Sequence, residues 1–75
     1  MMNHKERFLA EMDQAIIKGT SFKIEIKSPE LTSPEVITNP PENLEAKKAY
    51  YKKAYDENLC LKTNQSIEII SYRSF

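Results

Sequence analysis

The sequence predicts a small α+β domain in which two helices pack on one face of a small, mostly antiparallel sheet, in the order α-β-β-α-β. Three patterns predict this fold. Apolar residues recur at helical spacing from Asn3 to Lys18, apolar and charged residues alternate from Phe22 to Lys27, and β-branched and aromatic residues fill Ser66 to Tyr72. The chain of 75 residues has no internal repeat and no linker, so residues 1–75 are expected to form one domain.

The first helix has clear start and stop signals. Asn3 and Glu6 have the spacing of a capping box, and Gly19 follows the last helical residue, where a left-handed conformation commonly ends a helix. One apolar stripe runs along this helix, formed by Phe8, Leu9, Met12, Ala15 and Ile16. The helix should therefore bury one side and leave the other in water.

The strands are expected at three places. From Phe22 to Lys27 the alternation predicts one face on a core and one face of charged residues in water. The segment from Ser28 to Pro41 holds four prolines and reads as a loop around a short Val36-Ile37 strand, which we expect at a sheet edge. Ser66 to Tyr72 supplies the last strand, after a polar turn.

A second helix is expected after the prolines. Asn39 could cap it, Pro40 suits a first turn because no amide hydrogen is needed there, and Glu42 could reach back to the cap. Its end is ambiguous. The residues from Leu59 to Leu61 fit the last helical turn, or a short strand that forms a hairpin with the final strand; we favour the helical turn.

The second helix carries tyrosines and lysines together, and this gives two interpretations. In the first, Leu44, Tyr51 and Tyr55 form the centre of an apolar arc that packs on the sheet, with lysine stems along its edges. In the second, seven residues form a binding strip for a protein or for a single-stranded nucleic acid. These candidate site residues are Lys47, Lys48, Tyr50, Tyr51, Lys52, Lys53 and Tyr55. The first interpretation is favoured, because a helix that buries half its circumference cannot present all seven residues to one ligand.

Composition excludes several classes of function. Eleven basic and eleven acidic residues give a formal net charge of zero, which argues against bulk attraction to nucleic acid or to an anionic membrane. With only one cysteine and one histidine, the chain cannot form an intrachain disulfide or the usual four-ligand zinc site. No glycine-rich phosphate loop or nucleophile-base pair is evident, so we expect no catalytic residues, no metal and no cofactor.

The leading hypothesis is a small non-enzymatic interaction or regulatory protein that docks a protein partner, and the alternative is a single-stranded nucleic-acid-binding protein. No apolar run resembles a signal peptide or approaches the roughly 20 residues of a membrane span, so we expect a cytoplasmic protein with no membrane partner. Abundant lysine and isoleucine indicate an AT-rich genome, such as that of a low-GC Gram-positive bacterium or its phage or prophage. A homodimer would compensate for the small core.

Overall fold

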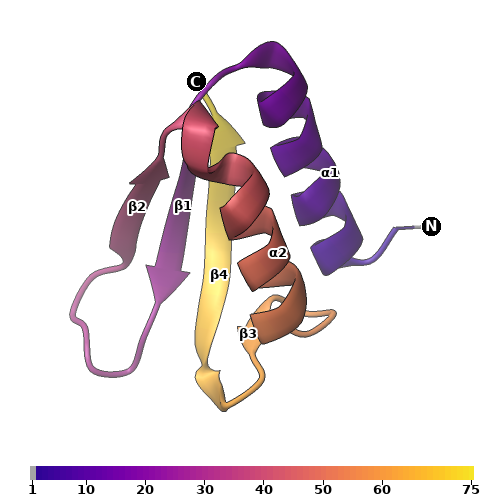
Figure 1. Cartoon of the computed structure of the whole chain (residues 1–75). Coiled ribbons are helices and arrows are strands. Elements are labelled where there is room, and N and C mark those ends of the chain that lie inside the picture. Colours follow the sequence, from indigo (N-terminus) through magenta and orange to yellow (C-terminus); the bar gives the residue numbers. More distant parts are fainter. Residues whose placement is uncertain (1) are drawn as a thin grey trace.

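Two helices cover one face of a four-stranded antiparallel sheet in the computed structural model, which describes residues 2–75 (Figure 1). The order α-β-β-α-β is confirmed, with one further short strand. The elements are α1 (His4–Lys18), β1 (Phe22–Lys27), β2 (Glu35–Asn39), a 3-10 turn η1 (Pro41–Asn43), α2 (Leu44–Ala54), β3 (Cys60–Leu61) and β4 (Asn64–Ser74). None of the helices within residues 2–75 is long and apolar enough to cross a membrane.

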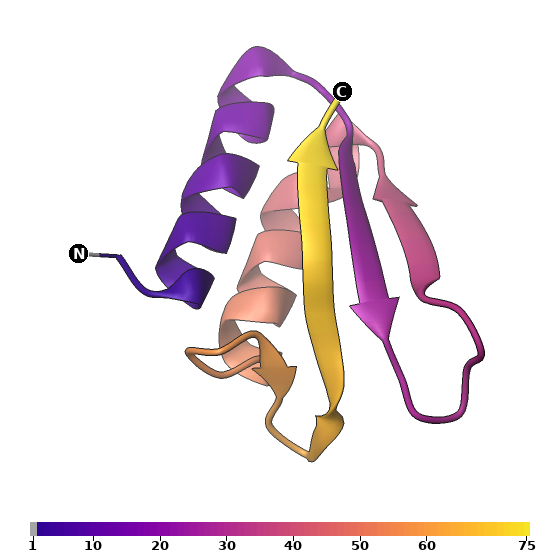
Figure 2. The ribbon, with the colours of Figure 1, turned by 180° about the vertical axis from the view of Figure 1, so that it is seen from behind.

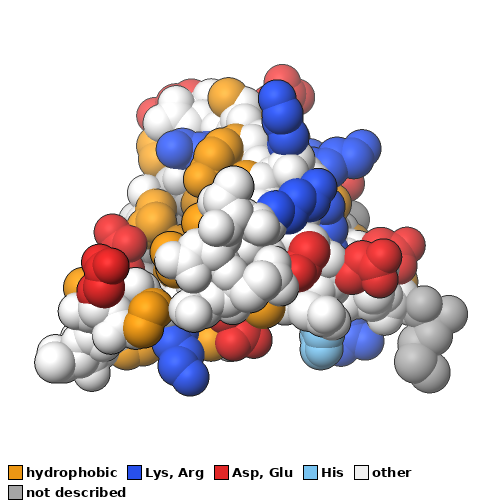
Figure 3. All heavy atoms as spheres, turned by 90° about the horizontal axis from the view of Figure 1, so that it is seen from below, with side chains coloured by type: hydrophobic (Ala, Val, Ile, Leu, Met, Phe, Trp, Pro, Cys, Tyr) orange, Lys and Arg blue, Asp and Glu red, His pale blue; other side chains and the backbone are white. Residues whose placement is uncertain are grey.

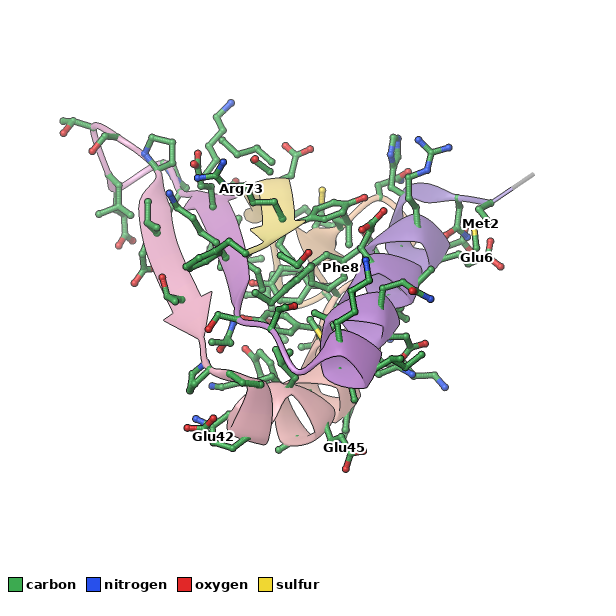
Figure 4. All side chains as sticks on the ribbon, turned by 90° about the horizontal axis from the view of Figure 1, so that it is seen from above. Met2, Glu6, Phe8, Glu42, Glu45 and Arg73 are labelled. Carbon is green, nitrogen blue, oxygen red and sulfur yellow. The ribbon has the colours of Figure 1, made fainter. Side chains whose placement is uncertain are left out.

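The strands lie in the order β2-β1-β4-β3, so the strand that comes last in the chain occupies the middle of the sheet. β2 is an edge strand, as expected from the prolines on either side of it. Figure 2 shows the back of the sheet without a helix over it. Charged side chains of β1 occupy this open face, and Arg73 of β4 points away from the helices while Phe8 points between the layers (Figure 4).

The caps of α1 form as the sequence predicts. The Glu6 amide donates to Oδ1 of Asn3 at 2.8 Å, and the Asn3 amide donates to Oε1 of Glu6 at 3.0 Å. At the other end Gly19 adopts a left-handed backbone with φ of 68°, and its amide bonds back to the last turn. A capping box and a left-handed glycine satisfy backbone groups that a helix end otherwise leaves unpaired.

The predicted start of the second helix is wrong. Asn39 is the last residue of β2, where its side chain points into the core and is only 3% exposed, so it cannot cap a helix. The chain instead turns through η1 before α2 begins at Leu44, and Asn43 at the cap position makes no side-chain hydrogen bond. Register explains the difference: Asn39 pairs with Phe22 and extends the β1-β2 ladder by one residue pair.

The predicted end of this helix is also wrong, because α2 stops at Ala54 and the hairpin alternative is the correct one. Oδ1 of Asp56 accepts hydrogen bonds from the amides of Asn58 and Cys60, which holds a tight turn. Aspartate stabilises such turns at the expense of helix, because its side chain offers backbone amides a local acceptor. Leu59 in this turn has a φ of 63°, and β3 then pairs with β4.

The core lies between the layers and is rich in aromatic rings. Phe8 is fully buried, and its ring packs edge-on at 5.8 Å from Phe22, 5.5 Å from Tyr51 and 5.1 Å from Tyr72. Edge-to-face pairs at such distances add about 0.5–1.5 kcal/mol each beyond their buried area. The core otherwise consists of Met12, Ala15, Ile24, Ile26, Leu44, Tyr55, Leu59 and Ile69.

Replacing Gly19 by alanine should lower the free energy of unfolding by about 1–2 kcal/mol, the cost of a left-handed backbone for a residue with a Cβ atom. A Cβ at this position would have no atom within 4 Å, so no steric clash adds to that cost. Urea unfolding of Gly19→Ala would measure the loss. Gly19→Asn is the matched control and should lose less, because asparagine tolerates this conformation better; equal losses in both variants would contradict the assignment.

Candidate functional site

The structure divides the three tyrosines of the predicted binding strip. Tyr51 and Tyr55 are each 3% exposed and belong to the core, whereas Tyr50 is 53% exposed. The rings still touch, with centroids 5.1 Å apart between Tyr50 and Tyr51 and 5.6 Å apart between Tyr51 and Tyr55. Only Tyr50 therefore offers a ring face to a ligand, and the interpretation that Leu44, Tyr51 and Tyr55 pack on the sheet is confirmed.

The four lysines of the strip are also divided. Lys48 lies between the helices, where its Nζ forms an ion pair with Asp13 of α1 at 2.6 Å. Both side chains are partly exposed, so this pair contributes no more than about 1 kcal/mol. The other three lysines, Lys47, Lys52 and Lys53, are exposed at different angles around α2. The structure thus does not bring the seven residues together on one surface.

What the structure does bring together is a shallow hollow beside the end of α2. We call it the Tyr50 hollow; it is lined by Tyr50, Lys53, Ala54, Leu61, Lys62 and Thr63, and its lining is mostly apolar. A backbone hydrogen bond from the Lys62 amide to the Ala54 carbonyl, 2.9 Å long, joins its two sides. In the view of this end of the molecule, apolar side chains gather mainly on the left half and lysine or arginine side chains lie above and beside them (Figure 3).

Sequence reasoning missed the half of the hollow formed by Leu61, Lys62 and Thr63. A helix continued to Leu61 would have placed these residues at or beyond its end, about three turns from Tyr50. The signal that could have found them is Asp56, since an aspartate three residues before a Leu-Cys-Leu run favours a turn into a strand. The Tyr55-Leu61 bridge then returns the chain to the end of α2.

Burial changes the acidity of the tyrosines beneath the hollow. It raises the pKa of Tyr55 from 10.0 to about 12, and the neighbouring hydroxyls of Tyr50 and Tyr51 add to the effect. The pKa of Tyr51 is raised by burial too, although the nearby amide of Asn39 offsets part of the change. Both phenols are therefore neutral at physiological pH and act as packing groups.

The Asn39 amide is the unusual polar group in this region. Its Nδ2 is buried, and the Tyr51 hydroxyl is close enough to affect it, but no contact within residues 2–75 reaches normal hydrogen-bond geometry. A buried donor without a partner costs about 1–3 kcal/mol, so native structures contain few of them. Asn39 lies on β2, the strand whose outer edge no other strand within residues 2–75 covers.

Residues 2–75 contain no group of three or more His, Cys, Asp or Glu side chains placed to hold a metal ion. Burial raises the pKa of the Cys60 thiol, and the charges of Asp56 and Glu68 raise it further, which disfavours the reactive thiolate. Comparison with known protein families, curated protein sequences and solved structures finds no match.

Adjacent tyrosines should respond very differently to substitution. Tyr51→Ala should lower the free energy of unfolding by about 3 kcal/mol or more, because it removes a buried ring from the core. Tyr50→Ala, the matched neighbour, should change it by less than about 1 kcal/mol. Chemical denaturation of both variants tests this, and equal losses would place both rings in the same environment.

Tyr55 should make stability fall in alkaline solution. Its pKa in the folded chain, about 12, exceeds the ordinary value of 10.0, so the folded state holds the proton more tightly than the unfolded state does. The stability from burying the neutral phenol is complete below pH 10 and is lost as pH rises towards 12. Urea unfolding across that interval should show a shallower decline for Tyr55→Phe than for the unmodified chain. Identical declines would refute the burial of this hydroxyl.

Proposed function

We propose that this chain is a small non-enzymatic interaction protein that regulates a protein partner by binding it at the Tyr50 hollow. The observation that supports this proposal is the half-exposed Tyr50 ring beside Ala54 and Leu61, with Lys53 and Lys62 at the border. Tyrosine is enriched among residues that dominate binding energy, because its ring supplies a large contact area at a small entropic cost. An apolar centre with a charged border is the usual arrangement of a protein interface.

The chemistry of the hollow favours an acidic segment as the partner. Lys53 and Lys62 both line the hollow and would pair with carboxylates of the bound chain. Such border charges mainly set the rate of association and the choice of partner. The apolar centre would accept one aliphatic or aromatic side chain of the same segment.

We place this activity in the cytoplasm of a low-GC Gram-positive bacterium, with a phage or prophage origin for the gene. The compositional bias towards lysine and isoleucine supports that origin. A regulator of this kind acts by occupying a surface of a larger host protein. It needs no catalytic group of its own.

A single-stranded nucleic-acid-binding function is the alternative. Lys47, Lys52 and Lys53 are exposed on the same helix as Tyr50 and could contact phosphates. The burial of Tyr51 and Tyr55 leaves one stacking ring instead of three, and the net charge is zero. The protein-binding proposal is therefore the better supported of the two.

Affinity capture with matched variants tests the proposed function. The unmodified chain and Ile17→Ala, which changes an exposed residue on α1, should retain the same bacterial protein from a lysate. Tyr50→Ala and Lys53→Glu should lose at least about nine tenths of it, as expected for a residue that dominates an interface and a charge on its border. Equal retention by all four proteins would refute binding at the hollow.

Fluorescence anisotropy with a labelled single strand distinguishes the alternative. Titration at about 50 and 200 mM salt spans the range in which phosphate contacts weaken steeply. We expect no binding at either salt concentration. Micromolar binding that falls with salt and is lost in a Lys52→Glu/Lys53→Glu variant would replace the protein-binding proposal by the nucleic-acid one.

A further inference from the structure

The outer edge of β2 carries backbone groups that no strand within residues 2–75 pairs. Ser21 and Phe75 exchange two backbone hydrogen bonds, of 3.1 and 3.0 Å, so they form a hydrogen-bonded pair at the start of the β1-β4 ladder. Backbone groups alternate in direction along a strand, so in β1 Lys23 and Glu25 bond towards β4 whereas Phe22 and Ile24 bond towards β2.

The same alternation fixes the direction of the groups in β2. Ile24 is paired with Ile37, so the amide and carbonyl of Ile37 point inward to β1. The amides and carbonyls of its neighbours, Val36 and Thr38, then point outward. β2 thus presents two donors and two acceptors in a row at the edge of the sheet.

This edge lacks the features that normally prevent strand pairing. Natural edge strands are protected by lysines, prolines or bulges. β2 contains none of these, its Val36 side chain is 53% exposed, and its single charge is Glu35 at one end. The nearest prolines, Pro34 and Pro40, lie just outside the strand, one at each end.

We propose that β2 pairs antiparallel with β2 of a second copy of this chain, about a two-fold axis through Ile37. Val36 of each copy then lies opposite Thr38 of the other, and the four outward groups of each strand form four hydrogen bonds across the axis. The two sheets become one continuous sheet of eight strands. The helices of both copies lie on the same face of it.

The flanking prolines select this register. Centring the axis on Val36 would place Thr38 opposite Pro34 of the other copy, and centring it on Thr38 would place Val36 opposite Pro40. Proline has no amide hydrogen to donate, so each of these registers loses hydrogen bonds. Only the register centred on Ile37 pairs every outward group of the strand.

Side chains on the helix side support the same register. Ile37, which is partly buried against the core, meets Ile37 of the second copy, so the row that begins at Ile24 continues across the axis. Glu35 falls opposite Asn39 of the other copy, where directly opposed side chains lie about 4.5–5.5 Å apart at Cβ. A carboxylate acceptor thereby reaches the neighbourhood of the buried Asn39 Nδ2, whose contact with Tyr51 within residues 2–75 of one copy falls short of normal hydrogen-bond geometry.

Charge favours the pairing as well. Glu35 of one copy lies opposite Asn39 of the other, four residues along the strand from the second Glu35. The two carboxylates therefore do not face each other. On the open face, Val36 pairs with Glu25 in its own copy, and Thr38 pairs with Lys23 in its own copy. Because Val36 lies opposite Thr38 across the axis, Glu25 of one copy and Lys23 of the other stand in the same row of side chains. The interface therefore brings no like charges together.

A register-specific cross-link tests the proposal. In a Cys60→Ser background, Ile37→Cys should form an intermolecular disulfide under mild oxidation, because the two copies of residue 37 lie opposite each other at about 4.5 Å between Cα atoms. Glu35→Cys is the matched control; its two copies lie about 13 Å apart along the strands and should not cross-link. Equal cross-linking of both variants, or none in Ile37→Cys, would overturn the register.

Sedimentation equilibrium measures the association itself. The unmodified chain and Thr38→Val should approach twice the 8.7 kDa monomer mass at micromolar concentration. Thr38→Pro removes an outward donor from each copy and leaves the β1-β2 ladder intact, so it should remain folded by circular dichroism while its dissociation constant rises at least about tenfold. A monomeric unmodified chain would refute the dimer, and the capture experiment at the Tyr50 hollow would be unaffected by that result.

Discussion

The ring of Phe8 is the contact on which the rest of this structure depends. It comes from α1, yet it packs edge-on against rings of β1, α2 and β4, so one side chain joins both helices to the two central strands. A domain of 75 residues buries only about 60% of the surface of its unfolded chain, so few other contacts can share this role. The need to surround Phe8 draws Tyr51 into the core and removes it from the surface.

That constraint separates the buried side of α2 from its exposed side. Tyr51 and Tyr50 are neighbours in sequence, but the helical rotation of about 100° per residue puts one ring in the core and the other at its border. The lysines divide in the same way, with Lys48 held by Asp13 and the others in solvent. The surface proposed for binding consequently lies past the end of α2, where β3 returns to it.

Local signals accounted for the elements that the sequence predicted well. α1 is bounded by a capping box and a left-handed glycine, and β1 shows uninterrupted alternation, so neighbours in sequence are enough to specify both. Asn39 and the segment around Leu59 were predicted wrongly, because their states depend on distant partners. Asn39 extends the ladder to Phe22, and Leu59 is held by an amide hydrogen bond from Ile69. The Tyr50 hollow escaped prediction for the same reason, since its two sides meet only when Lys62 bonds to Ala54.

The central position of β4 has a consequence for how the chain folds during synthesis. β4 supplies Ile69 and Tyr72 to the core and is the partner of both β1 and β3, but it is synthesised after the other elements of the sheet. Before it emerges, β1 can pair only with β2, and the apolar side of the sheet is incomplete. Pairing between distant segments is slow to form and leaves apolar surface exposed meanwhile. Completion of the sheet therefore waits for β4, and until β4 pairs with β1 and β3 the apolar sides of the helices have no complete sheet to pack on.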